Sequence, residues 1–378
     1  MAADDSELVF PPDFVWGAST AAHAVEGGNV NNDWWAWEHH PHSEVPEPSG
    51  DACDSFARWR EDVTLVADLG LGAYRFSLEW SRIEPAEGEF SGAALEHYRR
   101  QCAALLGRGV TPVVTFHHFT TPTWLAARGG WEASDAPECF ARYVTRATAH
   151  LGDLIGWACT INEPNLVAAM GYLGGQFPPG VKGDTVRCGA VTDALVRAHR
   201  LGGEALRAGP GDFGVGLTLS LGQSVAESTV VDQLLAATEG DDYVGVHAPA
   251  GGPTTNSGSP ADSGPHTPLG PAIRRAVGAS GLPLMVQSTV ETADDAERID
   301  GLTRALADVH RCLGEGIDLW GFFVWSLLDH FAWHQGWRSK SGLVGVAPGV
   351  FERRPKPSAQ WFGQVARSAR VSTATARS

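Results

Sequence analysis

A carboxyl group suited to acid–base chemistry stands beside a hydrogen-bonding amide in the stretch Thr-Ile-Asn-Glu-Pro at residues 160–164. An apolar run at residues 154–159 precedes this stretch, and a run of this length predicts a buried β-strand. Proline has no N–H group to donate to a sheet, so we expect the strand to end before Pro164 and to leave Asn162 and Glu163 at its C-terminal end. A carboxyl group there can protonate the leaving oxygen of a glycoside while the amide binds a sugar hydroxyl. The same five residues also fit a plain turn between a strand and a helix.

The composition limits the classes of partner. Hydrophobic residues make up 43% of the 378 residues and charged residues 19%, so the chain can bury a large core. A net charge of −16 argues against a nucleic acid or an anionic membrane surface as the main partner. No apolar run approaches the ~20 residues of a membrane span, and the acidic N-terminus lacks a signal-peptide pattern. We therefore expect a cytoplasmic protein that binds a small molecule, with its six scattered cysteines reduced.

Strand-like and helix-like patterns alternate along the chain and predict an α/β fold. Regular alternation implies parallel strands, and eight such units predict a (β/α)8 TIM barrel, here a single domain over residues 1–378. The alternative is an open doubly wound sheet, but no Gly-x-Gly-x-x-Gly follows the first strand. Residues 248–268 are rich in Gly, Ser, Thr and Pro, which predicts a flexible loop, and residues 23–27 and 29–42 are also predicted as loops. Strands are predicted at residues 14–19, 73–78, 111–117, 154–159, 213–219, 243–247, 283–287 and 319–325, and helices at 54–69, 93–106, 137–151, 192–208, 231–237, 271–279, 294–313 and 358–366.

Active sites of such barrels lie at the C-terminal ends of the strands and in the loops that follow them. The side chains that the predicted strands place there are rich in imidazole, indole and carboxylate. They are His23, Arg75, Glu79, Trp80, His117, His118, Asn162, Glu163, His247, Ser288, Trp325, Asp329, His330, Trp333 and His334.

Six separated stretches resemble glycoside hydrolase family 1, the retaining β-glucosidase family with a (β/α)8 barrel, and they occur in the family's order. The resemblance covers the chain from end to end, so it implies that the barrel fold extends over the whole chain. The matching stretches are residues 10–17 with 25–27, 74–82, 115–122, 160–164, 325–329, and 342–343 with 355–358.

The resemblance implies roles for individual residues. Glu163 would be the general acid/base, Asn162 would hold the sugar 2-hydroxyl, and Arg75 would stand beside the nucleophile. A structural alternative for Arg75 is an ion pair with Glu79 or Asp329. The other candidate contacts of the ligand are His23, Trp35, His118, Trp325, Asp329, His330 and Trp333.

The nucleophile position departs from the family pattern. The family carries its nucleophile in a Thr-Glu-Asn-Gly segment at the end of the seventh strand, where this chain reads Gln287, Ser288, Thr289 and Val290. Ser288 therefore stands where the nucleophilic glutamate is expected. Retaining hydrolysis needs two carboxyl groups about 5–5.5 Å apart, so we expect ordinary retaining β-glucosidase activity to be lost.

The sugar-binding positions depart as well. Ala24 replaces a sugar-binding glutamine, Ala332 replaces a sugar-binding glutamate, and His247 begins the segment that replaces Asn-Tyr-Tyr after the sixth strand. A site that binds hydroxyl groups loses affinity when their polar partners are removed. Ordinary glucosides should bind poorly, and the pocket should suit a less hydroxylated ligand.

Four hypotheses remain open on the sequence. The first is a divergent family 1-like enzyme that uses Glu163 as general acid/base on a small-molecule glycoside or related cyclic metabolite and needs no metal or cofactor. The second is a catalytically silent small-molecule binding protein on the same fold. The third is a conventional β-glucosidase that uses a non-aligned carboxylate such as Glu291. The fourth is a metal enzyme in which His23, His247 and His330 join Glu163, a chemically sensible zinc ligand set.

Overall fold

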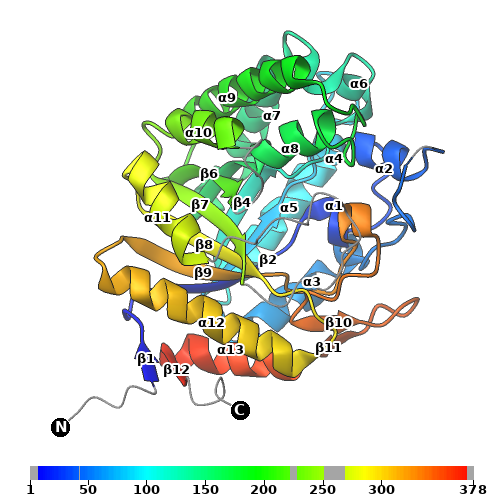
Figure 1. Cartoon of the computed structure of the whole chain (residues 1–378). Coiled ribbons are helices and arrows are strands. Elements are labelled where there is room, and N and C mark those ends of the chain that lie inside the picture. The colour runs from blue at the N-terminus through cyan, green and yellow to red at the C-terminus, as the bar shows by residue number, and fades with distance from the viewer. Residues whose placement is uncertain (1–6, 42, 222–227, 251–268, 373–378) are drawn as a thin grey trace.

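The computed structural model describes residues 7–41, 43–221, 228–250 and 269–372, and in this part of the chain eight parallel strands form a closed barrel (Figure 1). Each strand pairs with the next one along the chain, and the last pairs with the first to close the ring. The predicted TIM-barrel architecture is confirmed. The barrel strands are β2 (Val15–Ser19), β3 (Ala73–Ser77), β4 (Thr111–His117), β5 (Trp157–Asn162), β6 (Gly214–Ser220), β7 (Tyr243–Pro249), β8 (Leu284–Thr289) and β9 (Leu319–Trp325).

The interior of the barrel is filled by side chains below the C-terminal ends of its strands. Strands covered on both faces read as continuous apolar runs rather than as an alternating pattern, because one set of side chains fills the interior and the other packs under the helices. The contact that closes the ring requires glycine, since a Cβ on Gly321 would lie 2.5 Å from the Val15 carbonyl oxygen. The interior cluster consists of Ala73, Val113, Tyr243, Met285 and Phe323.

Helices surround the barrel, as Figure 1 shows, and each buries the apolar face that its sequence period predicts. In α7, for example, Phe140, Tyr143, Val144 and Ala147 are buried at helical spacing. The long helices are α3 (Ser55–Asp68), α5 (Gly92–Leu106), α7 (Ala136–Leu151), α9 (Thr185–Ala208), α10 (Ser228–Ala237), α11 (Leu269–Ser280), α12 (Asp295–Gly314) and α13 (Pro357–Ser368). Shorter ones on the loops are α1 (Ala22–Val25), α2 (Asp33–Glu38), α4 (Trp80–Ile83), α6 (Thr123–Ala126) and α8 (Pro164–Tyr172).

Several predicted boundaries are wrong. The predicted loops at 23–27 and 29–42 contain α1 and α2, and α2 forms because the Asn32 side chain accepts a hydrogen bond from the Trp35 N–H and caps it. The strand predicted from residue 154 begins only at Trp157, since Gly152–Leu154 form a 3-10 turn. Of the predicted loop at 248–268, the first two residues end β7, and residues 251–268 lie outside the described part of the chain.

The two ends of the described chain meet beneath the barrel. Strand β1 (Glu7–Val9) pairs antiparallel with β12 (Arg370–Ser372), and the two lie together at the lower left of Figure 1. A second small sheet pairs β10 (Val344–Val346) with β11 (Arg353–Pro355). Within the described residues, no helix is both long and apolar enough to span a membrane.

Candidate active site

Arg75 lies at the centre of the barrel mouth and is bonded to neutral groups. Its side chain donates from Nε to Thr115 Oγ1 at 3.0 Å, from Nη1 to Gln287 Oε1 at 3.0 Å, and from Nη2 to Asn162 Oδ1 at 2.7 Å. The residue is only 6% exposed. Among the described residues, no carboxylate forms an ion pair with it, so the expected alternative of a pair with Glu79 or Asp329 is wrong. A buried positive charge is therefore held by dipoles alone, which is an unusual and costly arrangement.

Gln287, rather than Ser288, faces the mouth from the seventh barrel strand. The Gln287 amide oxygen accepts hydrogen bonds from Arg75 and, at 2.8 Å, from Ser19 Oγ, and these two donors fix which end of the amide is oxygen. The Ser288 hydroxyl instead donates to the Ala248 carbonyl of β7 at 2.9 Å, and Ser288 is fully buried. The residue that contacts the arginine in this structure is therefore a neutral isostere of glutamate.

Glu163 stands at the end of β5, as predicted, and its backbone turns it into the site. It adopts a left-handed conformation with φ of 48°, which costs a residue with a side chain about 1–2 kcal/mol. The Glu163 carboxylate pairs with Nδ1 of His247 on β7, and the Nε2 of the same imidazole lies 2.7 Å from Thr289 Oγ1 on β8. A carboxylate at the end of β5, an imidazole on β7 and a hydroxyl on β8 are thus connected, with β6 lying between the first two strands.

Stacked rings form one wall of the site. The His118 ring stacks on Trp325 at 5.4 Å and on Trp333 at 5.8 Å, and the His23 ring stacks on Trp333 at 5.7 Å. Asn162 Nδ2 donates to His118 Nε2 at 3.2 Å. Burial and the nearby charge of Arg75 hold the pKa of His118 well below its usual range, so this imidazole is neutral at physiological pH.

A tryptophan of α2 packs on this wall, and it is Trp34, the neighbour of the predicted ligand contact Trp35. Trp34 contacts Trp333 with ring centroids 4.8 Å apart and is fully buried. The Trp35 ring contacts His39 and is half-buried. Adjacent residues on a helix point in different directions, which is why the choice between them needed the structure.

The remaining predicted ligand contacts have structural partners. Asp329 Oδ1 pairs with Lys356 Nζ at 2.8 Å and accepts from the Gly342 N–H at 3.0 Å. The His330 ring lies edge-on to Trp325, and burial lowers its pKa to about 4. Ala24 is fully buried and Ala332 is 9% exposed, so both present only a methyl group where the family resemblance implies amide or carboxylate groups.

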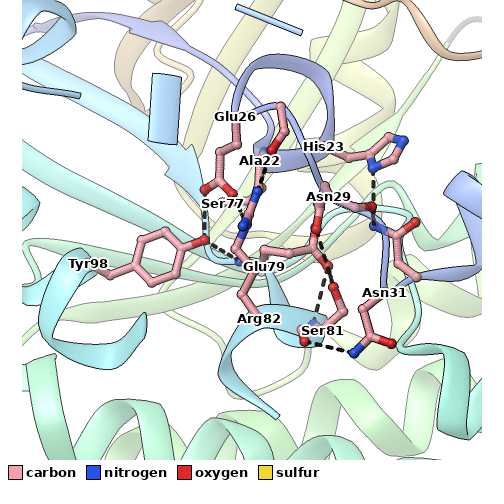
Figure 2. Close-up of polar contacts among 12 residues, drawn as sticks. Ala22, His23, Glu26, Asn29, Asn31, Ser77, Glu79, Ser81, Arg82 and Tyr98 are labelled. Carbon is pink, nitrogen blue, oxygen red and sulfur yellow. Dashed lines mark hydrogen bonds and ion pairs between the residues drawn. The ribbon is translucent and has the colours of Figure 1, made fainter. Parts of the chain in front are cut away.

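A polar network fixes the loop that carries His23 (Figure 2). Asn29 Nδ2 donates to Glu79 Oε2 at 2.6 Å, and Ser81 Oγ donates to Glu79 Oε1 at 2.7 Å. Asn32 Nδ2 lies 3.1 Å from His23 Nδ1 and also donates to the Asn29 carbonyl. Glu79 is therefore a structural anchor for the loop and not a group that acts on a ligand.

The same loop is tied to the barrel by a buried ion pair. Glu26 accepts from Arg82 Nε and from the Tyr98 hydroxyl, each at 2.7 Å (Figure 2). Burial raises the pKa of Glu26, and the Arg82 charge opposes this rise. Arg82 also lines a surface cleft of about 710 Å³ on the outer side of the loop, together with Trp59 and His97.

Two of the alternatives lose support from the geometry. His23, His247, His330 and Glu163 are not among the groups of described residues whose donor atoms converge closely enough to hold a metal ion. His23 instead faces Asn32 and Glu38, and His330 lies near the Leu328 carbonyl. Glu291 is exposed on the loop between β8 and α12, beyond the strand end that carries Thr289.

Comparison with known proteins agrees with the barrel fold. The family model described as Glycosyl hydrolase family 1 matches residues 6–246 and 276–371. The chain belongs to glycosyl hydrolase family 1. The first matched range ends at Val246, one residue before His247, so the match to the family breaks where the imidazole enters the site.

Family 1 relatives cover nearly the whole chain. Thermostable beta-glucosidase B of Thermobispora bispora is 31% identical over 97% of this chain and 93% of its own length. Beta-glucosidase A of Thermotoga maritima is 28% identical over 95% and 98%. The crystal structure of a beta-glycosidase superposes with a TM-score of 0.84 at 40% identity, covering 95% of this chain and 97% of its own. The family 1 b-glucosidase from Thermotoga maritima in complex with isofagomine lactam gives 0.86 at 25% identity, covering 97% and 100%.

Proposed function

We propose that this chain is a divergent family 1 enzyme that acts on a small-molecule glycoside or related cyclic metabolite, with Glu163 as general acid/base and without the ordinary retaining β-glucosidase route. The observation that carries the proposal is the contact between Arg75 and Gln287. An amide oxygen occupies the place beside the arginine where the family resemblance implies an attacking carboxylate. An amide cannot form and release a glycosyl-enzyme ester at a useful rate, so the two-carboxylate route lacks one of its members.

The contacts of Glu163 support its role as acid/base. It lies at the end of a barrel strand, is 4% exposed, and exchanges a hydrogen bond with an imidazole that can return a proton to it. Asn162, its neighbour, is held by Arg75 and His118 in a fixed orientation suited to a ligand hydroxyl.

The methyl groups of Ala24 and Ala332 support a ligand with fewer hydroxyl groups than glucose. The relatives are named for β-glucosidase activity, and a glucoside bound here would lose two polar partners that the family resemblance implies.

The test compares three proteins on a chromogenic β-glucoside. The unaltered chain and Ser288→Glu should hydrolyse it at background rate, because the Ser288 side chain faces the β7 backbone. Gln287→Glu places a carboxylate beside Arg75 and should raise the rate by roughly 10²-fold or more. Normal family rates from the unaltered chain, or a gain from Ser288→Glu and not from Gln287→Glu, would contradict the proposal.

A catalytically silent binding protein is the second candidate, and Glu163→Gln separates it from the first. Glu163→Gln is added to the Gln287→Glu variant. If the chain is an enzyme, the double variant should lose turnover of the β-glucoside but keep its affinity for the glucosidase inhibitor deoxynojirimycin. A scaffold without acid/base chemistry shows no turnover to lose in either protein.

A further inference from the structure

The chain Thr289–His247–Glu163 has the atom order of a nucleophile, a base and an orienting acid. Thr289 Oγ1 meets His247 Nε2 at 2.7 Å, and His247 Nδ1 meets the Glu163 carboxylate. When Glu163 is ionised and the imidazole is neutral, the proton on Nδ1 bonds to the carboxylate, and Nε2 is free to accept the threonine hydroxyl. This is the tautomer that a hydroxyl nucleophile needs.

The carboxylate is the least exposed of the three groups, which is the order that a buried orienting acid requires. The Glu163 side chain is 6% exposed, the His247 side chain is 19% exposed, and Thr289 is half-buried at the strand end. The acid is therefore the most shielded of the three groups, and the base and the hydroxyl are more exposed within the described structure.

The protein contains a second hydroxyl–imidazole–carboxylate chain, whose burial shows that it only stabilises the fold. Thr160 Oγ1 lies 2.7 Å from His199 Nδ1, and His199 Nε2 lies 3.1 Å from Asp241. Both Thr160 and His199 are almost completely buried between barrel and helices, and the roles of the two ring nitrogens are reversed. No ligand can reach that threonine.

We propose that Thr289 is an activated nucleophile and that the barrel mouth carries a second activity, the hydrolysis of small carboxylic esters. The proposal goes beyond glycoside chemistry and does not rest on it, although Glu163 would serve both. The same constellation of hydroxyl, imidazole and carboxylate recurs on unrelated folds, where geometry rather than sequence position identifies it.

The reaction balances with these groups and water. Thr289 Oγ1 bonds to the ester carbonyl carbon while its proton passes to His247 Nε2, and Glu163 stabilises the resulting imidazolium through Nδ1. The carbon–oxygen bond to the alcohol breaks, and the alcohol leaves with the proton from Nε2. Water then attacks the acyl-threonine with His247 as base again, which releases the carboxylic acid and returns the proton to Thr289.

An acyl group suits this nucleophile better than a glycosyl group. Attack on an anomeric carbon would create a threonyl glycoside, whose alkoxide is a poor leaving group without further protonation. An acyl-threonine is an ordinary ester that the same imidazole can hydrolyse.

The test uses p-nitrophenyl butyrate as substrate and a fluorophosphonate as covalent probe. Thr289→Val should lower the catalysed rate by roughly 10²-fold or more, and His247→Gln should do the same, whereas Thr289→Ser should retain or raise it. His150→Gln is the matched control, because His150 lies beside Glu96, its side chain is 36% exposed, and no hydroxyl of the described residues bonds to its ring. Its rate should equal that of the unaltered chain.

Peptide mass spectrometry after fluorophosphonate treatment gives the second measurement, which holds even if a variant is poorly folded. The label should map to Thr289 in the unaltered chain. Labelling elsewhere, no labelling, or an unchanged ester rate in folded Thr289→Val overturns the proposal. The glycosidase proposal is judged separately by the gain of β-glucoside hydrolysis in Gln287→Glu, so either can fail alone.

Discussion

The Nη1 of Arg75 donates to the side-chain oxygen of Gln287 at 3.0 Å, so the group of β8 that is hydrogen-bonded to this guanidinium is uncharged. A carboxylate at the same place would neutralise the arginine. Arg75 therefore has no carboxylate paired with it among the described residues, and several consequences can be measured.

Gln287→Glu should stabilise the fold as well as change its chemistry. The new carboxylate would form a buried, charge-assisted pair with Arg75, which we expect to raise the free energy of unfolding by about 1–3 kcal/mol. Urea unfolding at neutral pH measures it. Ser288→Glu is the control and should destabilise the protein, because it would bury a carboxylate without a cationic partner.

His117→Phe should stabilise the protein and reduce its sensitivity to acid. Neither His117 ring nitrogen has a hydrogen-bond partner among the described residues, and the ring packs on Trp131 at 5.1 Å. Replacing unsatisfied nitrogens by carbon should gain about 1–3 kcal/mol at neutral pH.

The same histidine makes stability depend on pH. Burial lowers its pKa to about 3, so between that value and the unfolded pKa of about 6.5 the unfolded state binds more protons than the folded state. Stability then falls as pH falls through this window, by on the order of 5 kcal/mol for this group. His117→Phe should lack this contribution, so its advantage over the unaltered chain should grow from pH 7 to pH 4. An advantage that stays constant with pH would contradict this account.

Removing Arg353 should be strongly destabilising. Its Nε and Nη2 reach the two Asp62 carboxylate oxygens at 2.8 and 3.2 Å, and the Asp62 side chain is 3% exposed. Arg353→Met leaves a buried carboxylate unpaired and should cost about 3–5 kcal/mol. Arg353→Met combined with Asp62→Asn should recover part of the loss, and a double variant as unstable as the single one would argue against the pair.

Adding Ala24→Gln and Ala332→Glu should restore affinity for a sugar-like ligand. Each change returns a polar group of the type that the family resemblance implies, and each charged or bidentate hydrogen bond is worth about 1.5–3 kcal/mol. Calorimetric titration with deoxynojirimycin should show at least roughly tenfold tighter binding for the double variant. Equal affinity in both proteins would mean that the pocket does not use these positions.

The sequence predicts the barrel well because each β-then-α unit shows an apolar run typical of a buried strand, followed by apolar residues at helical spacing. It also places Glu163, Asn162 and Arg75 correctly, since Pro164 ends a strand and the flanking motifs fix their positions. Which of Gln287 and Ser288 faces inward is not predictable in the same way. Both faces of a parallel barrel strand are buried, so the apolar pattern is the same in either orientation. The pairing of β8 with β9 shifts register between Leu284 and Met285, and from Met285 onward alternation turns Gln287 and Thr289 inward.

The contacts of His247 with its two partners likewise depend on the tertiary structure. Glu163 and Thr289 lie 84 and 42 residues away from His247 in the sequence. No local spacing signals it, and the imidazole stands just where the family pattern stops.

The pairing of Glu7–Val9 with Arg370–Ser372 places the segment before the first barrel strand next to the segment after the last helix, on the side away from the mouth. Val371 within that pair is fully buried, so the junction is part of the packed body. Strands β1 and β12 could accordingly be joined by a linker and the chain reopened in a surface connection such as the one between α10 and β7. The eight barrel strands would keep their order around the ring, and only the point at which synthesis begins would change.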